Sequence, residues 1–219
     1  MRDKIKILHL EDNVRDAELI KEMLLAGGID ADISVISKGS EYLAALEDKD
    51  FDIVISDYNL PEFDGLKALL ETQKKRKDIP FIYCSGTIGE ERAVQCLQYG
   101  AMDYVLKQRL DRLVPAVNRA LRLVREKRQR EFAERQLNRV MLAVENINEA
   151  ICMTDIEGTI IYINPYFTKM YGWTKDEITY KENPRILKSG KQGPEFYSQM
   201  WDTLIADKSV KVDMINKAK

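Results

Sequence analysis

The first half of the sequence predicts an α/β fold in which helices cover both faces of a parallel sheet. Short apolar segments rich in β-branched residues alternate five times with segments whose apolar residues recur every three or four positions. Repeated strand–helix units of this kind build parallel sheets wrapped by helices. Polar residues follow several of the apolar segments, at the sheet edge where open parallel sheets bind their ligands.

The strand–helix units follow one another between residues 5 and 106. We expect strands at residues 5–10, 31–36, 51–56, 81–84 and 103–106, and helices at residues 14–26, 40–46, 65–75 and 90–99. Gly27-Gly28 and Gly100 end two of the helices, and Pro80 opens a strand. A further helix is indicated by Leu113, Val117, Leu121 and Val124, which form an apolar stripe.

Asp57 is the most informative residue, because other reactive groups end the neighbouring strands. Glu11 and Asp12 follow the first strand, Ser85 follows the fourth and Lys107 follows the fifth. A carboxylate can attack phosphorus only if its negative charge and that of the phosphate are both offset. A hard divalent cation held by carboxylates achieves this, and Mg²⁺ needs only two or three protein oxygens because it keeps several waters. The sequence therefore predicts a site that handles phosphoryl groups.

Each group has an expected role in this site. We expect Asp12 and Asp57 to bind Mg²⁺ directly, Glu11 to act through water, and Asn59 to offer its backbone carbonyl. Lys107 would place its charge against a phosphoryl oxygen.

The hydroxyl that bonds the phosphoryl group has two candidates, Ser85 and Thr87. Ser85 is favoured, because it directly follows the apolar run and Gly86 beside it leaves room for the phosphoryl group. Ile88, next to Thr87, would crowd that group.

Residues 1–123 resemble a receiver domain of two-component response regulators. The resemblance rests on Leu10-Glu11-Asp12-Asn13, on the segment 57–65 (DYNLPEFDG), on Ser85-Gly86 and on the segment 100–107 (GAMDYVLK). It implies a flavodoxin-like (βα)5 fold with strand order 2-1-3-4-5. It also implies a cytoplasmic phosphoprotein in which Asp57 takes a phosphoryl group from a histidine kinase or phosphotransfer protein in the presence of Mg²⁺.

The family resemblance also assigns switch residues. It implies that Ser85 and Tyr104 reorient when Asp57 is phosphorylated, and Ser85 has the family's spacing of 22 residues before Lys107. The alternative for Tyr104 is a purely structural role, because an aromatic residue in a strand is often part of the core. Gln108 departs from the family, which usually has proline after the lysine, and we expect a freer loop there.

Two other functions compete with phosphoryl-accepting signalling. A Mg²⁺-dependent aspartyl phosphohydrolase often has a second acid two residues after its nucleophile, whereas this chain has Asn59. A phosphorylation-independent dimerising scaffold would not need the acidic set together with Lys107. We therefore expect a regulator that is not an enzyme, apart from slow autodephosphorylation. His9, the only histidine, is expected to be a buried strand residue.

Composition sets outer limits on the function. A chain of 219 residues suits two domains, and its apolar fraction of 45% can build real cores. The net charge of -2 does not indicate nucleic-acid binding, which usually needs a basic excess. No apolar run is long enough to span a membrane, and the N-terminus is unlike a signal peptide. The cysteines are scattered along the chain without a CxxC motif, at Cys84, Cys96 and Cys152. We therefore expect reduced, buried thiols of a cytosolic protein.

Residues 124–145 are expected to form a helical linker, possessing features of a coiled coil. Glu126 with Arg130 and Glu131 with Arg135 are pairs that favour an exposed helix. Four apolar residues then step by 3, 4 and 3 positions, as a coiled-coil seam does: Leu137, Val140, Val144 and Ile147. This spacing predicts that the linker helix pairs with that of a second copy to form a homodimer. The alternative is a single helix exposed to solvent.

Residues 146–219 are expected to form a second, α+β domain. Strands are predicted at residues 148–155, 159–164 and 210–215, and helices at 165–171, 175–178 and 194–205. Glu157-Gly158 would turn the first two strands into a hairpin. The segments 161–167 (IYINPYF) and 171–174 (YGWT) resemble a PAS sensor domain, which implies a role in pairing or signal relay.

The PAS family sheet has five strands, and only three are predicted here. We therefore expect a truncated PAS domain with an incomplete antiparallel sheet, in a fragment of a larger kinase or other output protein. No cofactor is expected, because residues 146–219 contain no histidine for haem and Pro184 stands where light-sensing relatives have their reactive cysteine.

Overall fold

The computed structural model describes residues 4–48, 50–61, 63–86 and 90–219. The chain divides into two compact units, Met1–Glu131 and Phe132–Lys219, and each is described by itself. The boundary falls inside a helix, and the linker over residues 124–145 stays a prediction. Among the described residues, no helix combines the length and the apolar character needed to cross a membrane.

The first unit contains five parallel strands in the order β2-β1-β3-β4-β5, which confirms the predicted fold class and strand order. The strands are β1 (Ile5–Leu10), β2 (Ala31–Ile36), β3 (Ile53–Ser56), β4 (Phe81–Ser85) and β5 (Asp103–Leu106). The helices between them are α1 (Val14–Ala26), α2 (Gly39–Asp48), α3 (Gly65–Lys75) and α4 (Glu90–Gln98). After β5, the 3-10 helix η1 (Lys107–Arg112) leads into α5 (Leu113–Asn146).

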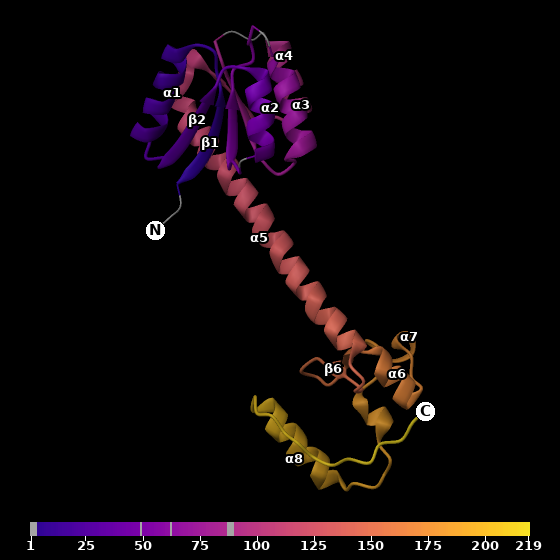
Figure 1. Cartoon of the computed structure of the whole chain (residues 1–219). Coiled ribbons are helices and arrows are strands. Elements are labelled where there is room, and N and C mark those ends of the chain that lie inside the picture. Colours follow the sequence, from indigo (N-terminus) through magenta and orange to yellow (C-terminus); the bar gives the residue numbers. More distant parts are fainter. Residues whose placement is uncertain (1–3, 49, 62, 87–89) are drawn as a thin grey trace. The chain divides into compact units, whose positions relative to one another are not determined.

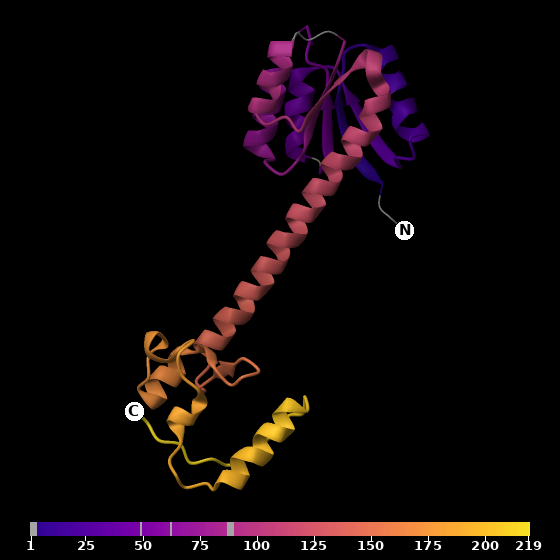
Figure 2. The same ribbon diagram turned by 180° about the vertical axis from the view of Figure 1, so that it is seen from behind.

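Helices cover both faces of this sheet (Figures 1 and 2). On one face, α1 and the first turns of α5 pack through residues such as Ile20, Leu24 and Val117. On the other face, α2, α3 and α4 pack through Tyr42, Leu69 and Cys96. All four residues of β3 are buried, as expected for a central strand of a parallel sheet.

The strand register brings two acidic segments together. Strands β1 and β3 are neighbours, and Leu10 lies opposite Ser56 at their carboxyl ends. Asp57, which directly follows β3, donates its backbone N–H to the carbonyl of Leu10 at 2.9 Å. Glu11 in turn donates its N–H to the carbonyl of Ile36 at 2.9 Å. Backbone hydrogen bonds therefore hold Glu11 and Asp57 at the same edge of the sheet.

The second unit is built around a two-stranded antiparallel sheet of β6 (Cys152–Thr154) and β7 (Ile160–Ile163). It also contains α6 (Pro165–Tyr171), α7 (Lys175–Ile178), the 3-10 helix η2 (Pro184–Leu187) and α8 (Pro194–Ile205), as Figure 1 shows in orange and yellow. Its small core consists of Ile160, Ile163, Phe167, Ile178 and Leu187.

The strand predicted at residues 210–215 was wrong. No residue of this segment belongs to a ladder, and the residue after it, Asn216, forms an isolated bridge with Lys188. An extended segment becomes a strand only when its backbone groups pair with a neighbouring strand. The sheet of the second unit contains β6 and β7, and residues 210–215 pair with neither. Apolar alternation alone could not reveal the missing partner. The helix η2 was not predicted from the sequence either.

Gly65 is expected to be needed for folding, because it begins α3 against the loop that follows Asp57. A Cβ at this position would lie 2.8 Å from Tyr58 Cα and 2.9 Å from the Tyr58 carbonyl oxygen. Backbone atoms cannot move aside cheaply, so Gly65→Ala should lower the free energy of unfolding by about 1–3 kcal/mol, as overpacking does. Urea unfolding followed by circular dichroism measures this change.

Gly86→Ala is the control for this experiment, since a Cβ there meets no described atom within 4 Å. Equal stability of the Gly65→Ala variant and the wild-type protein would show that the loop and α3 are not packed as described.

Candidate functional site

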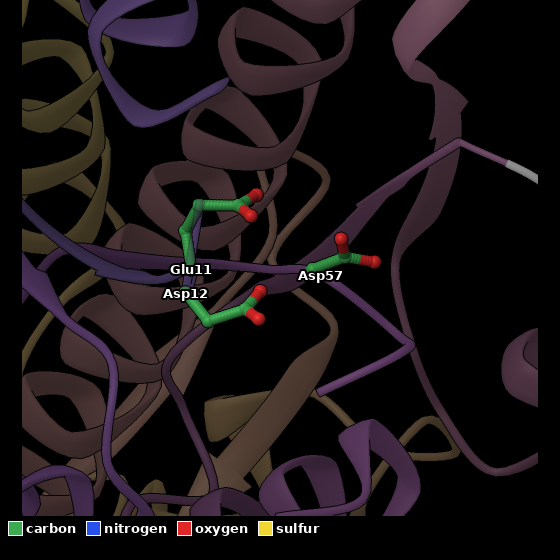
Figure 3. Close-up of side chains that lie close together, drawn as sticks. All are labelled: Glu11, Asp12 and Asp57. Atoms are coloured by element: carbon green, nitrogen blue, oxygen red, sulfur yellow. The ribbon is translucent and has the colours of Figure 1, made fainter. Parts of the chain in front are cut away.

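Three carboxylates converge at the carboxyl edge of the sheet. Glu11 and Asp12 follow β1, Asp57 follows β3, and one oxygen from each lies within 4.8 Å of the others. The carboxylates of Glu11 and Asp12 reach toward Asp57 (Figure 3). Glu11 and Asp57 are buried, with 2% and 7% of their surface exposed, whereas Asp12 is open to solvent. The site therefore has two buried acids, and an ion from solvent can reach it on the side of the exposed Asp12.

Lys107 supplies the positive charge of the site. Its Nζ lies 2.7 Å from Glu11 Oε2, 2.7 Å from Asp16 Oδ2 and 2.7 Å from Asp57 Oδ2. The contacts with Asp16 and Asp57 are hydrogen bonds, whereas the contact with Glu11 is an ion pair without hydrogen-bond geometry. The ammonium group thus faces three carboxylates, one after β1, one after β3 and one in α1.

The protonation of the acids follows from their surroundings. Burial raises the pKa of Glu11 and outweighs the opposing effect of Lys107. Burial also acts to raise the pKa of Asp57, but Lys107, the Ser85 hydroxyl and the backbone N–H of Asn59 together bring that pKa below its usual range. The pKa of Lys107 is raised, because its carboxylate contacts outweigh burial. Asp57 is therefore an ionised carboxylate paired with a charged lysine.

The loop after β3 orients Asp57. The backbone N–H of Asn59 donates to Asp57 Oδ1 at 3.1 Å, and the Ser56 hydroxyl donates to the Asp57 carbonyl at 2.7 Å. Behind the loop, the Tyr83 hydroxyl donates to the carbonyl of Gly65 at 2.8 Å. One carboxylate oxygen of Asp57 is thus bound by the loop, while the other contacts Lys107.

Sequence comparisons identify the family. Residues 7–118 match the family described as "Response regulator receiver domain", and residues 138–198 match a family described as "PAS domain". The first match covers more than half of the chain.

The chain belongs to the response regulator receiver family.

Its curated relatives are regulators. The transcriptional regulatory protein ZraR of Salmonella typhimurium is 32% identical over 127 residues, which cover 58% of this chain and 28% of ZraR. The regulatory protein LuxO of Vibrio cholerae is 27% identical over 114 residues, which cover 52% of this chain and 25% of LuxO. The matched segments thus span about a quarter of the length of these relatives.

Solved receiver structures share the fold. The signal receiver domain of a Luxo repressor protein from Vibrio parahaemolyticus superposes with a TM-score of 0.54 at 23% identity, covering 59% of this chain and 98% of that one. A response regulator receiver domain protein from Clostridium thermocellum gives a TM-score of 0.50 at 26% identity, covering 56% and 97%. These likenesses support the fold of the receiver.

The remaining predicted site residues belong to β4, β5 and the loop after β4. Ser85 ends β4 and is buried, and its hydroxyl helps to lower the pKa of Asp57 without meeting hydrogen-bond geometry. Tyr104 lies in β5, opposite Tyr83 of β4, and packs against the core on the α2–α4 face. Thr87, the alternative hydroxyl, lies outside the described residues.

The loop after Lys107 differs from the expected freer loop. Residues 107–112 form η1, and the Gln108 side chain donates to the carbonyl of Gly86 at 2.7 Å. The amide therefore ties the end of β5 to the loop that follows β4. A proline at this position would have no side-chain donor for that contact.

Asp16 also contacts the site, although the sequence did not predict it. It lies in the first turn of α1 and contacts Lys107, which is 91 positions away in the sequence. Its only signal was a four-residue spacing from Asp12, on a helix that starts at the acidic edge of the sheet. A first-turn aspartate is common at helix N-termini for electrostatic reasons, so this spacing alone did not indicate a role in the site.

The donor set fits Mg²⁺. One oxygen from each of the three carboxylates lies within 4.8 Å of the others, near enough to share one ion directly or through a bound water. The ligands are oxygens, and the exposed Asp12 side leaves space for the waters that Mg²⁺ retains. Asp12 and Asp57 would hold the ion directly, with Glu11 acting through water.

His9 is buried beside this site and should remain neutral in the folded protein. No surface of His9 is exposed, and neither ring nitrogen has a hydrogen-bond partner among the described residues. Burial, helped by the charge of Lys107, lowers its pKa from 6.5 to about 4. The unfolded chain then binds more protons than the folded one between these pH values, so stability should fall as the pH is lowered through this window.

We expect His9 to contribute about 3 kcal/mol to this acid destabilisation. Urea unfolding at several pH values between 7 and 4, without divalent cations, should show a smaller loss of stability in His9→Leu than in the wild-type protein. His9 is the only histidine, so its NMR signal in an untagged protein should not titrate near pH 6.5. Titration near pH 6.5 in the folded protein would contradict the burial of His9.

Proposed function

We propose that this protein is a two-component signalling regulator whose receiver accepts a phosphoryl group on Asp57 from a histidine kinase or phosphotransfer protein. The observation that carries the proposal is an ionised Asp57 that contacts Lys107 and lies beside two further acids at the sheet edge. Membership of the receiver family supports the same function.

The transfer is a substitution at phosphorus. An oxygen of the Asp57 carboxylate forms a bond to phosphorus while the bond from phosphorus to the donor's leaving group breaks, and the electron pair departs with that group. The product is an acyl phosphate, which water slowly hydrolyses back to the carboxylate. The lowered pKa of Asp57 keeps its carboxylate in the nucleophilic, ionised form at neutral pH.

The other residues of the site have separate parts in this step. Asp12 and Asp57 would hold Mg²⁺ directly, Glu11 would act through water, and the Asn59 backbone carbonyl would be a further ligand. When bound, the ion offsets the negative charge on the carboxylates and the phosphoryl oxygens. Lys107 donates to a phosphoryl oxygen, and Ser85 turns its hydroxyl toward another. Tyr104 then follows Ser85 and transmits the change to the surface.

The proposed route to the PAS domain is α5. This helix is continuous from Leu113 to Asn146, so it extends from the receiver into the second unit. We assign residues 1–123 to the receiver domain, 124–145 to the linker and 146–219 to the PAS domain. The proposed location is the cytoplasm, where the phosphodonor proteins of two-component systems act.

The aspartyl phosphohydrolase remains the alternative from the class of enzymes. The residue two positions after Asp57 is Asn59, whose backbone N–H donates to Asp57. An amide cannot act as the general acid that such hydrolases place at this position. This favours a long-lived acyl phosphate over rapid turnover.

Phosphorylation is expected to require Asp57. Incubation with acetyl phosphate and Mg²⁺ should add one phosphoryl group to the intact mass of the wild-type protein and none to Asp57→Asn. Chelation of Mg²⁺ should prevent the addition. Peptide mapping after borohydride trapping locates the adduct.

Asp32→Asn is the matched control, because Asp32 is an exposed carboxylate on β2, away from the acidic edge. Its labelling should equal that of the wild-type protein. Equal labelling of Asp57→Asn would overturn the proposal.

The linker part of α5 is proposed to pair with a second copy. Leu137 and Val140 of the predicted seam are 63% and 60% exposed in the single chain, so both offer apolar surface to a partner helix. A coiled coil would bury them. Val140→Lys should therefore shift the protein from dimer to monomer in sedimentation-velocity experiments.

Leu142→Lys is the control, since Leu142 is also 60% exposed but lies off the seam. Its dimer should persist. A wild-type monomer across the micromolar range, or equal loss of the dimer in both variants, would argue against pairing through this seam.

A further inference from the structure

We propose that Asp16 is a positioning residue that holds the Lys107 ammonium in the receiver site while a divalent cation is bound. The inference rests on the proposed phosphoryl-accepting function and names a residue that regulates the same site. It starts from the contact of 2.7 Å between Asp16 Oδ2 and Lys107 Nζ, which joins α1 to the end of β5.

Lys107 has as many carboxylate partners as it has N–H bonds. An ammonium group has three donors, and Glu11, Asp16 and Asp57 each place an oxygen 2.7 Å from Nζ. Only 15% of the Lys107 side chain is exposed, so water contributes little to its solvation. The position of the ammonium group is therefore set by these three acids.

The three partners differ in what else they bind. Glu11 and Asp57 belong to the metal-capable cluster with Asp12, but Asp16 is not part of that cluster among the described residues. A divalent cation in the cluster takes charge from Glu11 and Asp57 and also repels the ammonium group a few ångströms away. Asp16 keeps its full negative charge for Lys107, because it does not bind the ion.

Asp16 is therefore placed to retain Lys107 when its other two contacts weaken. One N–H stays with Asp16, and the other two remain available for the incoming phosphoryl oxygens. Without the Asp16 carboxylate, the cation would push the ammonium group toward solvent, and the transferring phosphoryl group would lose one of its positive contacts. Phosphorylation should then become slower, while Asp57 and the metal-capable acids stay in place.

Three variants separate this role from general charge and packing effects. Asp16→Asn keeps the size of the side chain but removes its charge, and Asp16→Glu restores a carboxylate. Glu18→Gln removes the same charge from an exposed position two residues further along α1. Urea unfolding of each full-length variant establishes that it is folded.

The first measurement needs no phosphodonor. In the presence of Mg²⁺, the NMR signal of a hydrogen-bonded, slowly exchanging Lys107 ammonium group should be present in the wild-type protein, in Asp16→Glu and in Glu18→Gln, and absent from Asp16→Asn. Lys107→Arg assigns the signal. Its persistence in Asp16→Asn would overturn the positioning role.

The second measurement is the rate of phosphorylation by acetyl phosphate with Mg²⁺. We expect the rate to fall about tenfold in Asp16→Asn, which corresponds to the free energy of one charge-assisted hydrogen bond. The rate should recover in Asp16→Glu and stay unchanged in Glu18→Gln. An unchanged rate in Asp16→Asn would also refute the inference. If the wild-type protein accepts no phosphoryl group, the proposed function fails, and the NMR signal still decides whether Asp16 positions Lys107.

Discussion

The contact between the Lys107 ammonium and the carboxylates around it is the interaction on which the receiver site depends. Glu11, Asp16 and Asp57 would repel one another if nothing offset their charges, and repulsion between close carboxylates raises their pKa. Lys107 lies 2.7 Å from an oxygen of each. Asp57 can thus stay ionised although it is buried, which a nucleophilic carboxylate requires.

The fold makes this contact possible because it brings together the ends of strands that are distant in sequence. The order β2-β1-β3-β4-β5 places β1 beside β3 in the centre, and backbone hydrogen bonds extend the ladder as far as Glu11 and Asp57. A similar constraint acts in the second unit. Asn164 is fully buried, accepts from the N–H groups of Ile151 and Phe167, and donates to the carbonyl of Val144 in α5. This side chain joins the end of α5 to the segments on either side of the two-stranded sheet.

Much of this architecture could be predicted from the sequence, because the apolar runs indicate the strands and the polar residues that follow them indicate the site. The continuous run Ile53-Val54-Ile55 indicated a buried strand, and the acids after β1 and β3 indicated the metal-capable cluster. Asp16 and Gln108 could not be predicted in the same way, because their partners are chosen by tertiary packing. The expected strand at residues 210–215 failed for a related reason, since pairing depends on a neighbour that local pattern does not specify.

The most direct test of the account is a calorimetric and NMR titration of the wild-type protein and Asp12→Asn with Mg²⁺, without phosphodonor. We expect one saturable site, with chemical-shift changes centred on the residues after β1 and β3, and markedly weaker binding in Asp12→Asn. Absence of saturable binding in the wild-type protein, or equal affinity in the two proteins, would contradict the claim that these acids form one cation site.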